Sequence, residues 1–263
     1  QSVAVRLIVE REREIQNFVG EDAYRVTALF MTKDGNEVKA ELNRRFSTEQ
    51  AANEFLEKCV KANFTVQDVT TKPQKRMPAA PFTTSTLQQE AAHKLGFTVA
   101  QTMMVAQHLY ENGRITYMRT DSVNLSSLCL GASKKVICEQ MGEEYVKTRQ
   151  YTTHSKGAQE AHEAIRPTYI ENTSIKGTAQ EQKLYELIWK RTVASQMADA
   201  RIMKTDIKVA SDKASEKFNV QASQVLFDGF LKLYMESSDE PQQDDDMVIL
   251  PEMKIGGIMH ENG

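Results

Sequence analysis

Residues 72–81, Lys-Pro-Gln-Lys-Arg-Met-Pro-Ala-Ala-Pro, separate two parts of the sequence that differ in character. This segment holds three of the 6 prolines of the chain, and such segments are typical of linkers and domain crossings. Strand-like patterns precede it, helical patterns follow it, and strand-like patterns return from residue 201 onward. The order predicts an α+β protein in which a mostly helical domain is inserted into a β-rich one.

The two predicted domains have defined limits. We expect a discontinuous β-rich domain made of residues 1–75 and 201–263, and a helical domain of residues 76–200. Before the linker we expect helices over residues 3–18 and 47–60 and strands over residues 24–30, 37–46 and 64–71. Between the crossings we expect helices over residues 84–95, 99–110, 126–141 and 180–200, and a short strand over residues 114–119. At the end we expect strands over residues 202–210, 217–222, 225–235 and 247–250.

The first two helices of the inserted domain lie close together in the sequence. Gly96-Phe97-Thr98 separates residues 84–95 from residues 99–110, and Thr98 is a good N-cap for the second helix. Two helices joined by a brief turn that contains glycine are the outline of a helix-turn-helix. With the short strand that follows, the sequence predicts a helical domain that resembles a winged helix.

The composition excludes several classes of protein. The 263 residues are 40% hydrophobic and 26% charged, which is typical of a globular chain with a real core. No uncharged apolar stretch approaches the roughly 18 residues of a membrane helix. The 3 cysteines are odd in number without CxxC spacing, and no secretory signal is visible, so we expect a cytoplasmic protein without disulfides. A start at Gln1 instead of Met predicts a fragment of a longer protein.

The net charge of -3 speaks at first against a nucleic-acid-binding protein. It is, however, an average over unlike segments. Residues 72–120 contain more basic than acidic side chains, namely Lys72, Lys75, Arg76, Lys94, Arg114 and Arg119 against Glu90 and Glu111. Residues 236–246, in contrast, contain acidic side chains and no basic one. The segment that would face DNA is therefore positive.

Tyr117 and Arg119 form the most informative pair of side chains. If residues 115–119 are extended, both side chains lie on one face, about 7 Å apart along the strand. A nearby guanidinium favours the phenolate form of tyrosine and can bind a phosphate through two hydrogen bonds. Tyrosine then becomes a nucleophile for a phosphodiester. Spacing alone nevertheless favours the plainer interpretation, a strand tyrosine next to a surface arginine.

A longer block of sequence gives this pair its meaning. Residues 115–122, Ile-Thr-Tyr-Met-Arg-Thr-Asp-Ser, with Asn-Leu-Ser at 124–126, resemble the active-site signature of bacterial type IA DNA topoisomerases. The resemblance extends to residues 81–89, Pro-Phe-Thr-Thr-Ser-Thr-Leu-Gln-Gln, and to residues 161–167, Ala-His-Glu-Ala-Ile-Arg-Pro. The opening residues 1–15 are similar to the helix that leads into the arch of the family. In the β-rich flanks the resemblance is looser.

The resemblance implies a role for three side chains. Tyr117 would attack a phosphorus of single-stranded DNA, which gives a phosphotyrosine link to the 5′ end and a free 3′ hydroxyl. Arg119 would orient the scissile phosphate and stabilise its charge. His162 would hydrogen-bond DNA near the site, although its position alone favours an ordinary histidine in a loop or at a helix start.

Thr120, Asp121 and Ser122 follow directly after the pair, and we expect them at the DNA-binding site as well. Thr120 and Asp121 are expected to support Tyr117 instead of reacting. Arg166 precedes Pro167, where helix is disfavoured, so Arg166 receives no role from the sequence.

The magnesium site of the family is missing from these residues. It lies in an acidic domain with an Asp-x-Asp motif, whereas Asp244, Asp245 and Asp246 are adjacent and fit a solvated acidic loop. The resemblance therefore implies Mg²⁺ in the intact enzyme, bound by a domain absent from this chain, with no metal and no cofactor expected here. No glycine-rich phosphate cradle is present, so ATP use is not indicated.

The leading hypothesis is thus an incomplete, monomeric fragment of an ATP-independent DNA topoisomerase, with the β-rich arch and the helical tyrosine domain. The intact enzyme would cleave single-stranded DNA, pass a strand and religate, relaxing negatively supercoiled DNA, and the fragment alone would not complete that cycle. The alternative is a non-enzymatic helix-turn-helix module that binds duplex DNA with sequence preference. A third interpretation, a structural interaction domain, predicts no affinity for nucleic acid.

Overall fold

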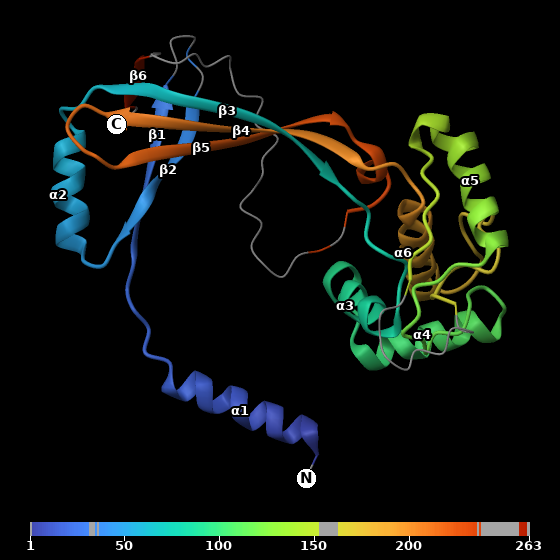
Figure 1. Cartoon of the computed structure of the whole chain (residues 1–263). Helices are drawn as coiled ribbons and strands as arrows, with labels where there is room; N and C mark the ends of the chain where they lie inside the picture. Colours follow the sequence, from blue (N-terminus) through green and yellow to red (C-terminus); the bar gives the residue numbers. More distant parts are fainter. Residues whose placement is uncertain are drawn as a thin grey trace. The chain divides into compact units, whose positions relative to one another are not determined.

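The computed structural model describes residues 2–31, 35, 37–152, 163–235, 237 and 258–261. The chain divides into two compact units (Figure 1). A β-rich unit combines residues 1–71, 205–222 and 248–263, and a helical unit combines residues 72–204 and 223–247. The α+β class predicted from the sequence is confirmed. Residues 223–247, which we expected in the β-rich domain, instead group with the helical unit.

The β-rich unit is built on antiparallel strands. Their bounds are β1 Tyr24–Met31, β2 Glu37–Phe46, β3 Phe64–Arg76, β4 Ala200–Ser211, β5 Lys217–Phe227 and β6 Ile258–Glu261. Of these strands, β3, β4 and β5 have residues 72–76, 200–204 and 223–227 grouped with the helical unit. Within the described residues the strand order is β1-β2-β5-β4-β3-β6, and β6 closes the sheet into a barrel by pairing with both β1 and β3. The β1–β2 hairpin runs from the pair Met31↔Glu37 to the pair Tyr24↔Phe46.

Aromatic side chains fill the interior of this unit. The ring centroid of Phe30 lies 5.0 Å from that of Phe64 and 5.4 Å from that of Phe218. The helix α2, Glu49–Cys59, adds Phe55 to the same core and begins at Thr48, whose hydroxyl accepts a hydrogen bond from the backbone of Ala51. In β1 to β5, buried side chains on one face of each strand contribute to this core.

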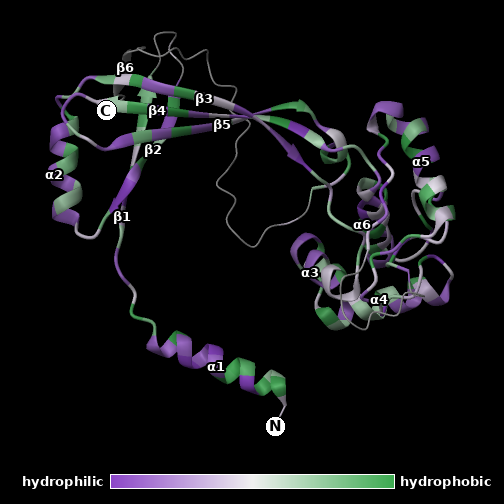
Figure 2. Ribbon diagram, in the orientation of Figure 1, coloured by the Kyte–Doolittle hydropathy of each residue, from purple (hydrophilic) through white to green (hydrophobic). Residues whose placement is uncertain are grey.

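A charged helix precedes the sheet. The helix α1, Val3–Asn17, has no buried residue. Its surface carries local ion pairs. Arg6 Nε lies 2.7 Å from Glu10 Oε1, and Arg11 Nη1 lies 2.6 Å from Glu14 Oε2. Figure 2 shows hydrophobic residues between the hydrophilic ones along this helix. The ion pairs, whose members are three or four positions apart, stabilise the helix locally.

The helical unit contains four α-helices in its described residues. They are α3 Thr84–Leu95, α4 Val99–Glu111, α5 Ser127–Met141 and α6 Ala179–Ser195, with short 3₁₀ turns η1 Glu143–Tyr145 and η2 Gly229–Lys232. The core is formed by the apolar sides of these helices, and Leu184 and Ile188 of α6 are fully buried. The indole nitrogen of Trp189 donates to the backbone oxygen of Ile170 at 2.8 Å.

The turn between α3 and α4 follows the sequence signals closely. Thr83 and Thr86 form a capping box at the start of α3, and Thr98 caps α4. Gly96 ends α3 with φ 66°, a conformation that glycine adopts without steric cost. The two predicted helices are confirmed. The start of α3 is joined to the loop that carries Tyr117 by hydrogen bonds between Thr84 and Thr120.

Two strand predictions need correction. The strand β3 continues through Pro73 to Arg76, where we expected a linker. Residues 71–76 are exposed, and a strand tolerates a proline in a stretch that is not enclosed by the sheet. β5 is one strand to Phe227, after which the chain turns at Gly229. A Cβ on Gly229 would lie 2.5 Å from the backbone oxygen of Ala198, so the turn requires glycine. The predicted strand 247–250 lies outside the described residues.

None of the helices in the described part of the chain is long and apolar enough to cross a membrane.

Candidate active site around Tyr117

Tyr117 lies on an irregular loop between α4 and α5. The loop follows Gly113, which has φ 65°, and within it only Ile115 forms a β-bridge, to Pro167. The strand expected over residues 114–119 is therefore wrong. The physical reason is that the loop changes its bonding partner: residues up to 116 pair with residues 164–168, and residues 118–120 pair with Thr84 at the start of α3.

Buried neighbours anchor the tyrosine. Ile115 and Met118 are each 2% exposed, whereas Tyr117 between them is 44% exposed. The Tyr117 ring packs edge-to-face against the ring of Tyr110 on α4, with 5.3 Å between the centroids. Among the described residues the phenol oxygen has no hydrogen-bond partner, so it is open to a ligand.

Arg119 is exposed on the same loop. Within the described ranges its guanidinium forms no hydrogen bond or ion pair, so its donors are free for an anion. The bends at residues 118 and 119 remove the extended geometry from which we expected Tyr117 and Arg119 to share a face. The two side chains remain neighbours on one exposed loop, and their joint action on a phosphate stays a prediction.

The three residues after Arg119 mainly organise the loop. The hydroxyl of Thr120 accepts a hydrogen bond from the backbone of Ser122 at 3.0 Å, and the hydroxyl of Ser122 accepts one from the backbone of Asn124 at 3.2 Å. Ser122 is only 1% exposed, so it offers no surface for a DNA contact and supports the loop from inside, which corrects our expectation for it. Asp121 is exposed.

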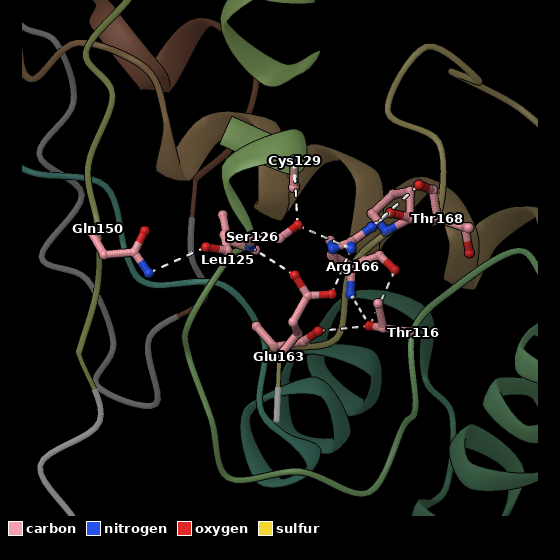
Figure 3. A network of polar contacts seen from close by, with 10 residues as sticks. Thr116, Leu125, Ser126, Cys129, Gln150, Glu163, Arg166 and Thr168 are labelled. Carbon is pink, nitrogen blue, oxygen red and sulfur yellow. Dashed lines mark hydrogen bonds and ion pairs between the residues drawn. The ribbon is translucent and has the colours of Figure 1, made fainter. Parts of the chain in front are cut away.

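A polar network next to the loop connects residues that the sequence did not identify as a group (Figure 3). Arg166 pairs with Glu163 at 2.5 Å, and the other carboxylate oxygen of Glu163 accepts a hydrogen bond from the backbone of Ser126 at 2.7 Å. The Ser126 hydroxyl caps α5 by accepting from the backbone of Cys129. The network thus ties residues 163–166 to the start of α5, at the far end of the Tyr117 loop.

Thr116 connects the same network to the tyrosine. Its hydroxyl donates to the backbone oxygen of Ala164 at 2.6 Å and accepts from the backbone N–H of Arg166 at 2.9 Å. Its own N–H donates to the backbone oxygen of Arg166 at 2.9 Å. The residue directly before Tyr117 is therefore fixed by three hydrogen bonds.

The electrostatics of the network keep Glu163 ionised. Burial raises the pKa of Glu163, but the hydrogen bonds from Ser126 and the charge of Arg166 together lower it below its ordinary value. Burial also raises the pKa of the nearby Cys129 thiol to about 11. This cysteine is thus a protonated core residue and not a nucleophile.

We predict that Arg166→Met destabilises the helical unit. It leaves the Glu163 carboxylate, which is 30% exposed, without its charged partner, at an expected cost of about 1–3 kcal/mol in the free energy of unfolding. Urea unfolding followed by circular dichroism measures this cost. The matched control is Lys190→Met, which breaks the exposed Lys190–Glu186 pair and should cost less than about 1 kcal/mol.

The pH dependence of the same measurement identifies the cause. Because the pKa of Glu163 is lowered from 4.5 in the folded chain, its ion pair stabilises the fold above that pH and loses this effect as the pH falls. The difference in stability between the wild-type chain and Arg166→Met should therefore shrink on acidification below pH 4.5. A difference that stays constant down to pH 3 would contradict an ionic role for Glu163.

Two predicted features lie outside the described residues. His162 is one of them, so the structure leaves its expected DNA contact untested. The acidic segment with Asp244, Asp245 and Asp246 is the other. In the described ranges, no three His, Cys, Asp or Glu side chains gather closely enough to hold a metal ion. These ranges therefore provide no cluster that fits Mg²⁺.

Comparison with known proteins gives a consistent result. A family model described as DNA topoisomerase matches residues 1–262. The DNA topoisomerase 1 of Zymomonas mobilis is 42% identical over 260 residues, covering 94% of this chain and 21% of the relative. That of Pseudomonas aeruginosa is 41% identical over 266 residues, covering 97% of this chain and 30% of the relative.

A solved structure of a topoisomerase I is also similar to this chain. The full-length topoisomerase I from Thermotoga maritima matches with a TM-score of 0.72 and 30% identity, covering 97% of this chain and 43% of that one. The chain thus spans between about a fifth and a third of the length of these two curated relatives.

Proposed function

The chain belongs to the bacterial type IA DNA topoisomerases, and from this premise we propose that it is the central, tyrosine-bearing part of an enzyme that changes DNA topology. The observation that carries the proposal is the Tyr117 loop. It presents an accessible phenol and a guanidinium without a partner among the described residues, on a backbone that is anchored on both sides. Anchored reactive groups on an exposed loop are what a reaction with a large substrate requires.

The proposed reaction is a transesterification. The phenol oxygen of Tyr117 attacks a backbone phosphorus of single-stranded DNA and loses its proton. The bond from phosphorus to the 3′ oxygen breaks, and that oxygen leaves as a free 3′ hydroxyl while the 5′ phosphate stays on the tyrosine. Because one phosphodiester replaces another, religation needs no ATP. Passage of a strand before religation would relax negatively supercoiled DNA.

Arg119 contributes electrostatics in this proposal. Charge develops on the phosphate oxygens during the attack, and a guanidinium can donate two parallel hydrogen bonds to them. The exposed position of Arg119, two residues after the nucleophile, supports this role. We assign His162 a DNA contact near the same phosphate and Mg²⁺ to a domain outside this chain. The β-rich unit would act as the arch that moves the Tyr117-bearing unit.

The chain itself is expected to prefer single-stranded DNA. A site that presents Tyr117 to a single backbone should bind an oligonucleotide more tightly than the corresponding duplex. Fluorescence anisotropy with the two labelled DNAs, at one salt concentration, measures the ratio. Tighter, sequence-dependent binding of the duplex would favour the helix-turn-helix module without chemistry. If the chain binds neither the single-stranded nor the duplex DNA, the result would favour a structural interaction domain.

The chain alone is also expected not to relax supercoiled DNA. In our proposal the magnesium site and the rest of the gate lie in other parts of the enzyme. Relaxation should appear only in the restored enzyme, which we define as a full-length relative, such as that of Pseudomonas aeruginosa, with this chain in place of its matching segment. Gel electrophoresis of plasmid topoisomers tests both proteins. Efficient relaxation by the chain alone would contradict the proposed division of labour.

A further inference from the structure

Thr84, the first residue of α3, lies against the backbone of the Tyr117 loop. Its hydroxyl is 2.8 Å from the backbone oxygen of Met118 and 3.1 Å from that of Thr120, and it accepts the backbone N–H of Thr120 at 2.9 Å. Its own backbone N–H donates to the oxygen of Thr120 at 2.9 Å. One residue therefore satisfies backbone groups on both sides of Arg119.

The hydroxyl of Thr84 is not needed to begin the helix. Thr83 accepts the N–H of Thr86 through its side chain, and the Thr86 hydroxyl accepts the N–H of Thr83 at 2.9 Å, which completes the capping box. Ser85 lies 3.2 Å from the Thr83 hydroxyl. Of these four neighbouring hydroxyl side chains, Thr84 is the one that bonds to the Tyr117 loop.

The helix that carries Thr84 is itself firmly placed. Leu87 and Ala91 are 0% exposed in the core. Glu90 is 4% exposed and accepts hydrogen bonds from the hydroxyl of Tyr234 at 2.5 Å and from the backbone of Ser237 at 2.8 Å. A reactive loop that is hydrogen-bonded to a packed helix is held in a more precise position than a loop without such support.

We propose that Thr84 is a positioning residue for the DNA cleavage at Tyr117. Thr116 fixes the loop before Tyr117 by its bonds to residues 164–166, and Thr84 fixes it after Tyr117 by its bonds to residues 118–120. The backbone on either side of the phenol and of the guanidinium is thereby set before DNA binds. This inference rests on the proposed function and adds a residue that acts through the backbone of the Tyr117 loop.

The test is Thr84→Val in the restored enzyme. Valine keeps the branched shape but loses the bonds of the hydroxyl to the backbone of Met118 and Thr120, whereas the backbone N–H of residue 84 can still donate to the oxygen of Thr120. In single-turnover cleavage of a labelled single-stranded oligonucleotide, we expect a rate about 10²-fold lower, as for reacting groups displaced by about 1 Å. The oligonucleotide Kd should stay within about twofold, because ground-state binding is not removed. Thr84→Ser keeps the hydroxyl and should cleave within about threefold of wild type.

The matched control is Thr86→Val, the same substitution in the same turn of the helix. It removes a bond of the capping box but touches no residue of the loop. It should lower the unfolding temperature without slowing cleavage of the folded enzyme. If Thr84→Val does not fold, Thr84→Ala takes its place, because alanine is the best helix former and also lacks the hydroxyl.

The outcomes separate the two proposals. Cleavage by folded Thr84→Val or Thr84→Ala at the wild-type rate overturns the positioning role, and so does equal slowing by Thr86→Val. Tyr117→Phe is measured in parallel. If that variant still forms a covalent adduct, the proposed function fails whatever Thr84 does. If Tyr117→Phe abolishes the adduct while Thr84→Val cleaves normally, only the role of Thr84 is wrong.

Discussion

Replacing Tyr117 with Phe in the restored enzyme is expected to abolish the covalent DNA adduct and to lower relaxation by at least about 10⁴-fold, as for the loss of other enzymatic nucleophiles. The substitution removes only the phenol oxygen. The ring can keep its packing against Tyr110 at 5.3 Å, and the anchors at Ile115 and Met118 are untouched. The loss would therefore report chemistry and not folding. Denaturing gels with labelled single-stranded DNA detect the adduct.

Tyr110→Phe is the matched control for this experiment. Tyr110 is 41% exposed and Tyr117 is 44% exposed, and both rings belong to the same edge-to-face contact. Removal of the Tyr110 hydroxyl should leave the adduct in place. If the adduct depended on Tyr110 and not on Tyr117, or persisted without either hydroxyl, the assignment of the nucleophile would be wrong.

Replacing Arg119 with Ala is expected to have the second largest effect. It removes the guanidinium that we place on the scissile phosphate, and loss of one group that stabilises developing charge lowers kcat by about 10²- to 10³-fold. Folding should be little affected, because Arg119 is exposed and has no hydrogen bond or ion pair within the described residues. Single-turnover cleavage of the oligonucleotide gives the rate, and thermal unfolding verifies the fold.

Two further variants define the role of Arg119. Arg119→Lys keeps the charge but loses the two parallel donors, so its cleavage rate should fall between those of wild type and Arg119→Ala. Lys134→Ala removes an exposed charge on α5 and should cleave like the wild type. Equal losses for Arg119→Ala and Lys134→Ala would mean that Arg119 contributes only general attraction for DNA.

Local signals in the sequence predicted the helices of the site region well. The start of α3, the glycine that ends it at residue 96 and the N-cap of α4 at Thr98 all depend on residues within a few positions of each other. The change from strand-like to helical composition around residues 72–81 is likewise a local signal, and the first boundary between the two units lies between residues 71 and 72. Tyr117 and Arg119 were found through the block at residues 115–122.

Features that depend on distant partners could not be predicted. The loop at residues 114–119 has strand composition, but its backbone bonds to residues 164–168 on one side and to Thr84 on the other, so it cannot form a regular strand. The role of Arg166 could not be predicted from its position before Pro167. Its partner Glu163 also accepts a hydrogen bond from Ser126, which is 37 positions away from Glu163 in the sequence. The burial of Ser122 likewise depends on how the whole loop folds.

Identification of the residue that becomes linked to DNA is the most direct test of Tyr117 as the nucleophile. The restored enzyme is trapped on a single-stranded oligonucleotide, digested with trypsin and nuclease, and the nucleotide-linked peptide is sequenced by mass spectrometry. Cleavage after Arg114 and Arg119 releases residues 115–119, Ile-Thr-Tyr-Met-Arg. We predict that this peptide carries a 5′-linked nucleotide on Tyr117. A nucleotide on any other residue, or a 3′ linkage, would contradict the account.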